Sequence, residues 1–214
     1  MNIRKHNLAA DPRFGLASDA LALQHVKLMF TSAVFDFDYT LADSSQGVVE
    51  CINFALAELG LEPVDYATAC RTIGLSLKAT YQTIAGERPA SEAEKFSRLF
   101  IQRADETMVQ MTVLYDTVGP TTQALRSDGI SLGIVSTKYR RRIQAVLARE
   151  GLLERFDIIV GGEDVIEHKP DPEGLIKAMA ALGGDPERTV YVGDSVTDAM
   201  VAERTGVPFV AVLT

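Results

Sequence analysis

The feature that most constrains the fold is a regular alternation of short, β-prone apolar runs with helix-like segments, which begins near Tyr115 and continues to the end of the chain. Strands are predicted at 130–135, 156–160, 189–192 and 208–213. Helices are predicted at 120–127, 139–150, 172–182 and 197–204. Such alternation is typical of parallel strands joined by right-handed crossovers. It predicts an α/β fold with an open, parallel, Rossmann-like sheet and helices on both faces.

A further strand, Thr31–Phe37, is separated from this alternation by a long helical stretch. In that stretch apolar residues such as Val48 and Ile52 recur at helical spacing. A second long helix is predicted to open at Ser91, because Ser91 and Glu94 have the spacing of a capping box. The predicted organisation is an N-terminal extension (1–30), a core in two pieces (31–42 and 115–214) and an inserted all-helical domain (43–114).

The charge balance argues against nucleic acid and membrane surfaces as partners. The chain has 21 Lys and Arg residues against 29 Asp and Glu residues, a net charge of −8, and an acidic surface repels phosphate backbones and anionic lipid. No apolar run approaches the ~18 residues of a membrane span, and the first residues do not read as a secretory signal. Cys51 and Cys70 form neither a disulfide framework nor a metal motif. We therefore expect a cytoplasmic protein, a monomer or homodimer, that acts on a small molecule.

Polar side chains follow four of the predicted strands, at the point where each strand ends. They are Asp36 and Asp38 at the end of the first strand, Ser136, Thr137 and Lys138 after the second, Lys169 in the loop after the third, and Asp194 with Asp198 one turn later after the fourth. Ligand sites of open α/β sheets lie at the carboxyl ends of the strands. These residues are therefore the candidate site residues.

The residue types at this edge suit phosphoryl transfer. Asp36 and Asp38 lie on the same side of an extended segment, and with Asp194 nearby the carboxylates repel one another unless a cation lies between them. Ligands that are all oxygen favour Mg²⁺. Lys169 is then the positive charge left for an anionic ligand, and the Ser136 hydroxyl is a neutral donor. This combination predicts phosphoryl transfer through an aspartyl-phosphate.

The same residues resemble the four motifs of the haloacid dehalogenase (HAD) superfamily, in the same order. The motifs are DFDYTL at 36–41, Ser136, Lys169-Pro170, and GDSVTD at 193–198. The helical insert is similar to that superfamily's C1 cap, and the nearest branch resembles the phosphoglycolate phosphatase-like hydrolases. The resemblance covers residues 31–214. It implies a Mg²⁺-dependent phosphatase of a small phosphorylated metabolite, with phosphoglycolate as the first substrate to consider.

The resemblance also implies a role for each matching residue. Asp36 would be the nucleophile, and Asp38 would protonate the leaving oxygen and then deprotonate the attacking water. Mg²⁺ would be held by Asp36, the backbone carbonyl of Asp38, and Asp194. The remaining implied roles concern the surroundings of the phosphoryl group: Ser136 and Lys169 would hold its oxygens, Thr40 would support the loop, Thr137 and Lys138 would face the substrate, and Asp198 would lie beside the metal ligands.

Two features depart from the family pattern. Tyr39 stands where the family usually has Gly, although it replaces none of the reacting groups. The chain stops at Thr214, where relatives usually continue with another helical stretch, so we expect a short or incompletely represented C-terminus.

Other interpretations remain open at this point. A phosphomutase of the β-phosphoglucomutase type would share these motifs, and a non-catalytic HAD-like scaffold is a weaker alternative. A receiver domain is disfavoured, because its third strand would end in the phosphorylated Asp, and here that strand ends in Val160-Gly161-Gly162.

Three further groups of residues lie near the expected site. His168 is expected to be a loop residue rather than a general base, and Arg140, Arg141 and Arg142 are expected to form a solvated helix face. The resemblance implies that a cap loop such as RTIGLSLK at 71–78 selects the substrate, and its members Arg71, Gly74 and Lys78 are the candidates.

Overall fold

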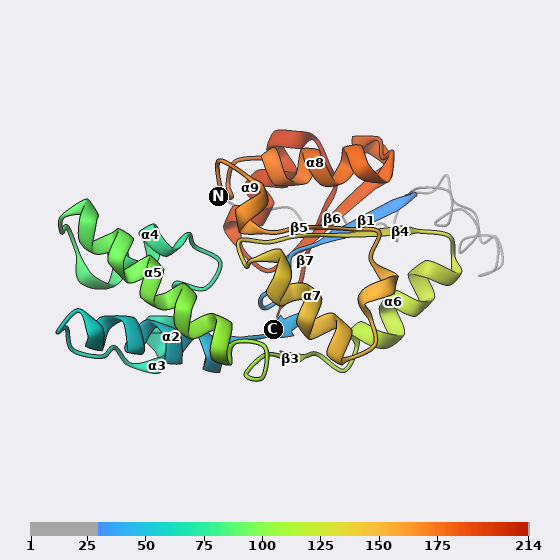
Figure 1. Ribbon diagram of the computed structural model, residues 1–214. Coiled ribbons are helices and arrows are strands. Elements are labelled where there is room, and N and C mark those ends of the chain that lie inside the picture. Colours follow the sequence, from blue (N-terminus) through green and yellow to red (C-terminus); the bar gives the residue numbers. More distant parts are fainter. Residues whose placement is uncertain (1–29, 214) are drawn as a thin grey trace.

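The computed structural model describes residues 30–213, so the extension predicted for residues 1–30 lies almost wholly outside the described part (Figure 1). The strands are β1 (Ser32–Phe35), β2 (Ala42–Asp43), β3 (Val113–Leu114), β4 (Ser131–Val135), β5 (Ile158–Val160), β6 (Thr189–Gly193) and β7 (Phe209–Ala211). The helices are α2 (Ser45–Glu58), α3 (Tyr66–Cys70), α4 (Leu77–Ala85), α5 (Ala90–Thr107), α6 (Val118–Ser127), α7 (Arg140–Arg149), α8 (Glu173–Leu182) and α9 (Val196–Thr205), with 3₁₀ turns η2 (Leu153–Arg155), η3 (Gly162–Asp164) and η4 (Pro186–Arg188). Among these described helices, none has the length and apolar character needed to cross a membrane.

Five strands form one parallel sheet in the order β5-β4-β1-β6-β7. β1 lies in the middle, where Phe35 is level with Ile134 of β4 on one side and with Val192 of β6 on the other. The predicted open parallel sheet is thus confirmed. Strand order reverses at β1, and such a switch point leaves a crevice at the carboxyl ends of the central strands.

Helices cover both faces of this sheet (Figure 1). α6 and α7 pack on one face, and α8 and α9 pack on the other. The side chains of β1 alternate accordingly: Ala33 and Phe35 join the apolar cluster that includes Ile143 of α7, whereas Val34 joins the cluster that includes Leu175 of α8. A strand buried on both faces is apolar throughout, which explains why β1 reads as a continuous apolar run.

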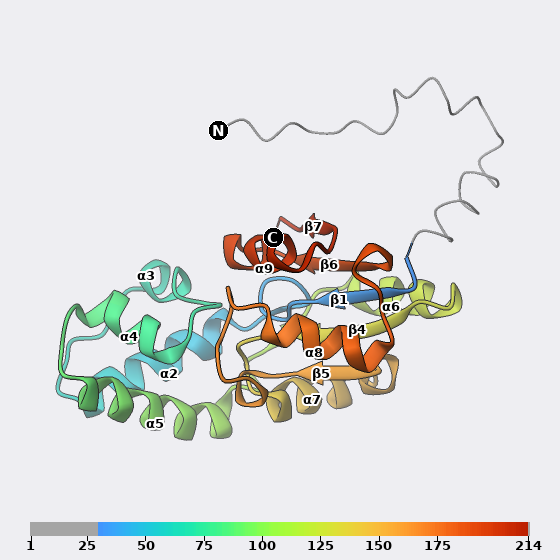
Figure 2. The same ribbon diagram turned by 90° about the horizontal axis from the view of Figure 1, so that it is seen from above.

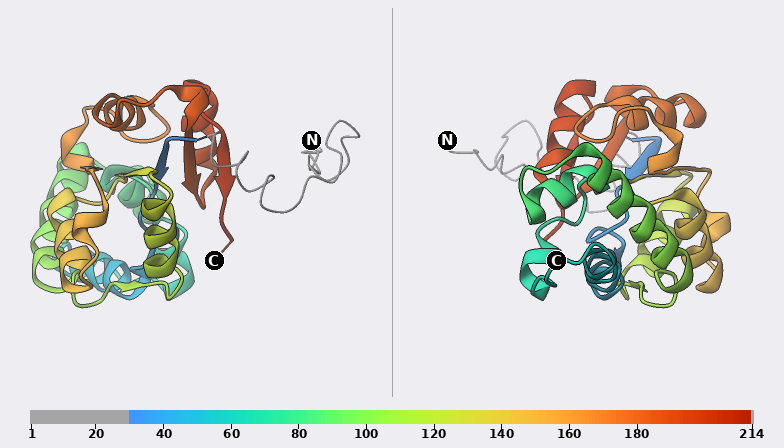
Figure 3. Two further views of the ribbon diagram at one scale, coloured as in Figure 1. Left: turned by 90° about the vertical axis from the view of Figure 1, so that its right-hand side faces the viewer. Right: turned by 60° about the vertical axis from the view of Figure 1, so that its left-hand side comes forward.

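The helices α2–α5, here called the helical insert, enclose an apolar core of their own. Ile52, Tyr81 and Phe96 come from three different helices of the insert and are almost fully buried there, with the rings of Tyr81 and Phe96 5.0 Å apart. Figure 2 shows these helices together at one end of the sheet, and the right-hand view of Figure 3 places them in front of the core. The insert leaves the core just after β1, so it lies at the end of the sheet where β1 ends.

Two expectations for this segment differ from the structure. The segment is not helical at its ends, because Asp43 in β2 and Val113 in β3 pair as a two-stranded antiparallel ribbon. Two residues are too few to show an alternating pattern in the sequence. The predicted capping box is also wrong: α5 already begins at Ala90, after Pro89, and has no side-chain cap.

Candidate active site

The carboxyl ends of three neighbouring strands bring several predicted site residues to one edge of the sheet. Asp36 follows β1 and its N–H donates to the carbonyl of Val192 in β6, at 2.9 Å. Ser136 follows β4 directly, and Asp194 follows β6 directly. Because these strands are parallel and in register, the three side chains leave the sheet at the same edge.

Asp36 is almost fully buried beside a lysine. Its side chain is 5% exposed, and the Nζ atom of Lys169 lies 2.9 Å from its Oδ1 atom. Burial raises the pKa of Asp36 to about 7, although the Lys169 ammonium pulls in the opposite direction. Oδ1 is buried, and the charged group against it is the Lys169 ammonium. A phosphoryl group or a cation that binds Asp36 would therefore meet this lysine at the same place.

Asp198 orients Lys169. Its Oδ1 atom accepts hydrogen bonds from Lys169 Nζ at 2.7 Å and from the Tyr191 hydroxyl at 2.8 Å. Its Oδ2 atom accepts from the hydroxyl of Ser195 at 2.5 Å and from the Ser195 N–H at 3.1 Å, as the capping box that opens α9. Burial raises the pKa of Asp198, but Lys169 and these donors outweigh it and hold the pKa below its usual value.

The same contacts keep Lys169 charged. Burial lowers the pKa of Lys169, but the surrounding Asp36, Tyr191 and Asp198 groups outweigh that effect and hold the pKa well above its usual value. Tyr191 was not singled out from the sequence. A tyrosine in the middle of a core strand was a usable signal, because a buried phenol usually finds a hydrogen-bond partner.

Asp38 is held by groups other than those around Asp36. Lys138 Nζ donates to both carboxylate oxygens, at 2.9 and 3.2 Å, and the Ser44 hydroxyl donates to Oδ1 at 2.6 Å. Ser44 precedes α2 and makes no side-chain cap with it. The expectation that Asp36 and Asp38 share one side is thus only partly met, because the carboxylate of Asp38 lies outside the acidic cluster that contains Asp36. Sequence spacing could predict neither the ion pair between Lys138 and Asp38 nor the hydrogen bond from Ser44 to Asp38.

The loop between Asp38 and β2 makes a tight turn. Tyr39 has a φ of 59°, in the left-handed region where glycine is favoured, which explains why a glycine would suit this position. Burial and a hydrogen bond with Cys70 of α3 raise the pKa of the Tyr39 hydroxyl. Thr40 donates to Asp194 Oδ1 at 3.2 Å and thereby supports that carboxylate.

The acidic cluster fits a divalent cation. Ligand oxygens of Asp36, Asp194 and Asp198 lie within 4.8 Å of one another, and burial together with Asp198 raises the pKa of Asp194. Asp198 already accepts four hydrogen bonds, whereas Asp36 contacts Lys169 through Oδ1 and Asp194 accepts from Thr40 through Oδ1. Asp36 and Asp194 are thus the side chains better placed to bind a cation, and an all-oxygen donor set suits Mg²⁺.

The other predicted residues take different positions. The Ser136 hydroxyl accepts from the N–H of Lys138 at 3.3 Å.

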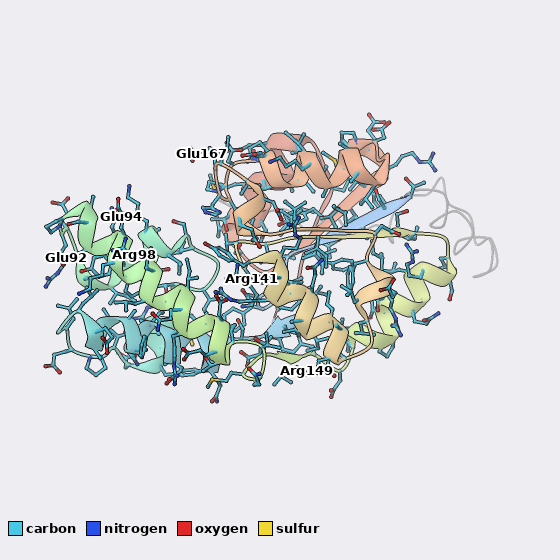
Figure 4. All side chains as sticks on the ribbon, in the orientation of Figure 1. Glu92, Glu94, Arg98, Arg141, Arg149 and Glu167 are labelled. Atoms are coloured by element: carbon cyan, nitrogen blue, oxygen red, sulfur yellow. The ribbon has the colours of Figure 1, made fainter. Side chains whose placement is uncertain are left out.

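The prediction that the arginines of α7 form a solvated face is wrong for Arg142. This residue is 5% exposed and donates to Asp105 and to the carbonyl of Ile101 in α5. Arg141 reaches the same Asp105 across the space between α7 and α5 (Figure 4). These arginines therefore join the core to the helical insert.

A cavity of about 450 Å³ lies between the helical insert and the core. The core contributes seven lining residues, Asp38, Thr137, Lys138, Tyr139, Arg142, Glu167 and His168. Glu167, on the core loop between η3 and α8, lines the cavity together with Leu77 and Lys78 of α4. From the expected selecting loop, Gly74 and Lys78 line the cavity, whereas the Arg71 guanidinium donates to Thr68 in α3. Asp38 is the lining residue that comes from the loop after β1.

Comparison with known proteins identifies the family of this chain. The model of the haloacid dehalogenase-like hydrolases matches residues 33–212. A phosphoglycolate phosphatase from Aquifex aeolicus is 31% identical over 173 residues, covering 81% of this chain and 80% of its own, and one from Cereibacter sphaeroides (strain ATCC 17025) is 35% identical over 184 residues, covering 82% of each. A solved structure from Bacteroides fragilis, described as a haloacid dehalogenase-like hydrolase, superposes with a TM-score of 0.82 at 42% identity, covering 85% of this chain and 87% of its own.

Proposed function

The chain belongs to the haloacid dehalogenase-like hydrolases, and from that premise we propose that it is a Mg²⁺-dependent phosphatase of a small phosphomonoester that works through an aspartyl-phosphate. The observation that carries the proposal is the buried Asp36, whose Oδ1 atom lies 2.9 Å from Lys169 Nζ and which clusters with Asp194 and Asp198. Phosphoglycolate belongs to this substrate class, and it is the substrate in the names of the curated relatives.

In this mechanism Asp36 attacks the phosphorus atom and the bond to the leaving oxygen breaks. Lys169, held by Asp198, binds a phosphoryl oxygen, and Ser136 donates a second hydrogen bond. Asp38 gives a proton to the leaving oxygen, which contributes typically ~10²–10⁴-fold to such a step. Asp38 then takes a proton from the water that attacks the aspartyl-phosphate, which frees inorganic phosphate and restores Asp36.

The contacts of Asp38 fix its position. Lys138 and Ser44 hold its carboxylate in the lining of the cavity, where the leaving oxygen of an ester bound at Asp36 would lie. Asp36, Asp194 and the backbone carbonyl of Asp38 would hold Mg²⁺, whose charge would offset the repulsion between the carboxylates and the phosphoryl oxygens. We also propose that residues 43–114 act as a cap domain over a core of 31–42 and 115–214, excluding bulk water on closure.

Phosphate release from p-nitrophenyl phosphate and a panel of small phosphomonoesters, phosphoglycolate among them, tests the proposal. Wild type is expected to turn over esters with Mg²⁺ and to lose this activity in EDTA. Asp36→Asn keeps the size of the side chain and is expected to abolish turnover without unfolding the chain. Asp116→Asn, an exposed carboxylate away from the site, is the matched control and should keep wild-type activity.

Turnover that persists in Asp36→Asn would remove this residue as the nucleophile. A phosphomutase of the β-phosphoglucomutase type is distinguished by its products, because it isomerises a sugar phosphate without net release of phosphate. Mg²⁺ is tested independently of activity by the Mg²⁺-induced rise in the unfolding temperature, which Asp194→Asn should reduce.

A further inference from the structure

The cavity between the helical insert and the core lies beyond the expected position of the phosphoryl group. Its walls include Asp38 but not Asp36, Asp194, Ser136 or the Asp198 that orients Lys169. Asp38 faces the leaving oxygen in the proposed mechanism. The cavity is therefore the space for the alcohol part of the ester, separate from the site of its phosphoryl group.

This space is much larger than a glycolyl group requires. Its volume is about 450 Å³. Pockets of ~300–1,000 Å³ are typical of sites that enclose ligands of the size of a drug molecule. A two-carbon acid would leave most of the cavity filled with water and would gain little from the walls.

The wall formed by the helical insert has seven apolar residues beside five polar ones and Gly74. Its apolar members are Val48, Ile73, Leu75, Leu77, Phe100, Ile101 and Met108. Two hydroxyls of this wall are already engaged within the insert, because Thr72 donates to the carbonyl of Ala69 and Ser97 donates to the carbonyl of Ala93. Such a wall favours an apolar group over the hydroxyls of a sugar, which would lose hydrogen bonds to water on entry.

The buried cations of the cavity are neutralised by carboxylates of the protein. Lys138 pairs with Asp38, and Arg142 pairs with Asp105, in each case with the basic side chain less than a tenth exposed. Lys78 also contributes to the lining, but it is exposed to solvent. A second anionic group on the substrate would thus find the two buried cations occupied by carboxylates and would be left with the exposed Lys78.

We propose that the natural substrate is a phosphomonoester whose alcohol carries an apolar or aromatic ring, bound in this cavity against the apolar wall of the helical insert. The inference rests on the proposed function and narrows its substrate class. It ranks such an ester above phosphoglycolate for this chain.

Two esters that differ only by a ring test this inference. Ethyl phosphate and 2-phenylethyl phosphate both release a primary alcohol, so a difference in kcat/KM reports on binding of the ring. With Mg²⁺, wild type is expected to prefer 2-phenylethyl phosphate by at least about ten-fold, the scale of discrimination that apolar pockets reach. Equal values for the two esters, or a higher kcat/KM for phosphoglycolate than for 2-phenylethyl phosphate, would overturn the inference.

A pair of variants on α5 tests whether the ring of the ester binds in the cavity. Ser97 lines the cavity, so Ser97→Phe would fill it and is expected to bring the ratio of the two kcat/KM values close to one. Ser91→Phe makes the same substitution at an exposed position of α5 outside the lining and should keep the wild-type ratio. An unchanged ratio in a folded Ser97→Phe variant would place the ring elsewhere and contradict the inference.

A binding measurement separates this inference from the proposed function. If wild type hydrolyses none of these esters, the proposed function fails. Calorimetry with the non-hydrolysable ethylphosphonate and 2-phenylethylphosphonate in the presence of Mg²⁺ then tests the apolar subsite separately. Binding of 2-phenylethylphosphonate at least about ten-fold tighter supports the apolar subsite. Equal affinities overturn it, whatever the activity.

Discussion

Lys138 Nζ lies 2.9 Å from Oδ1 of Asp38, and the two side chains are only 4% and 8% exposed. The pair joins the turn after β4 to the loop after β1. A buried carboxylate that loses its cation is left without compensation for its lost hydration. The position and the charge of Asp38 therefore depend on a residue one hundred positions away in the sequence.

We expect Lys138→Met to lower the free energy of unfolding by about 3–5 kcal/mol, the range for breaking one half of a buried ion pair. Urea unfolding measures it. The double variant Asp38→Asn with Lys138→Met is the control, because it removes both charges and should lose less than the sum of the single variants. Additive losses would show that the two charges do not stabilise each other.

Asp198→Asn is expected to destabilise the protein by about 1.5–3 kcal/mol, since Lys169 loses a charged hydrogen-bond partner. Tyr191→Phe removes one hydroxyl from the same carboxylate and is the matched control, with an expected loss of about 0.5–1.5 kcal/mol. Phosphatase activity should fall further in Asp198→Asn than in Tyr191→Phe, because only the first change frees the ammonium that binds the phosphoryl group. Equal effects of the two variants on activity would argue against a positioning role for Asp198.

The backbone conformation of Tyr39 predicts the order of stability of variants at this position. Its φ of 59° is strained for a residue with a Cβ atom and most strained for a β-branched one. Tyr39→Val is therefore expected to be less stable than Tyr39→Gly by at least about 1 kcal/mol, as measured by thermal and urea unfolding. A Val variant as stable as the Gly variant would mean that the loop changes its backbone conformation.

A pH dependence follows from Glu173, near the loop that carries Lys169. Lys177 and the N–H groups of Ile166 and Glu167 donate to its carboxylate and lower its pKa from 4.5 to about 2. A lowered pKa means that the ionised group stabilises the folded state, fully above pH 4.5 and progressively less as the pH falls towards 2. The difference in unfolding temperature between wild type and Glu173→Gln should therefore be present at neutral pH and shrink on acidification. A difference that stays constant with pH would contradict this assignment.

The helices and strands of the core were predictable because their signals are local. The residues of β1 are apolar and β-prone, and Gly183 and Gly206 close α8 and α9 with a positive φ, as glycines after helices commonly do. The two-residue strands β2 and β3 were not predictable, because their pairing joins Ala42 to Leu114 and depends on the approach of the two ends of the helical insert.

For the site, the sequence by itself determined which chemical groups meet. Asp36, Ser136 and Asp194 each directly follow a parallel strand, and the carboxyl ends of parallel strands lie at a common edge. Only the tertiary structure decided which group pairs with which. Lys138 pairs with Asp38 while Lys169 pairs with Asp36 and Asp198, and the two lysines look alike in the sequence. The physical reason is that an ion pair or a cavity wall depends on side-chain direction and burial between distant segments, whereas strand ends depend on local hydrophobic pattern.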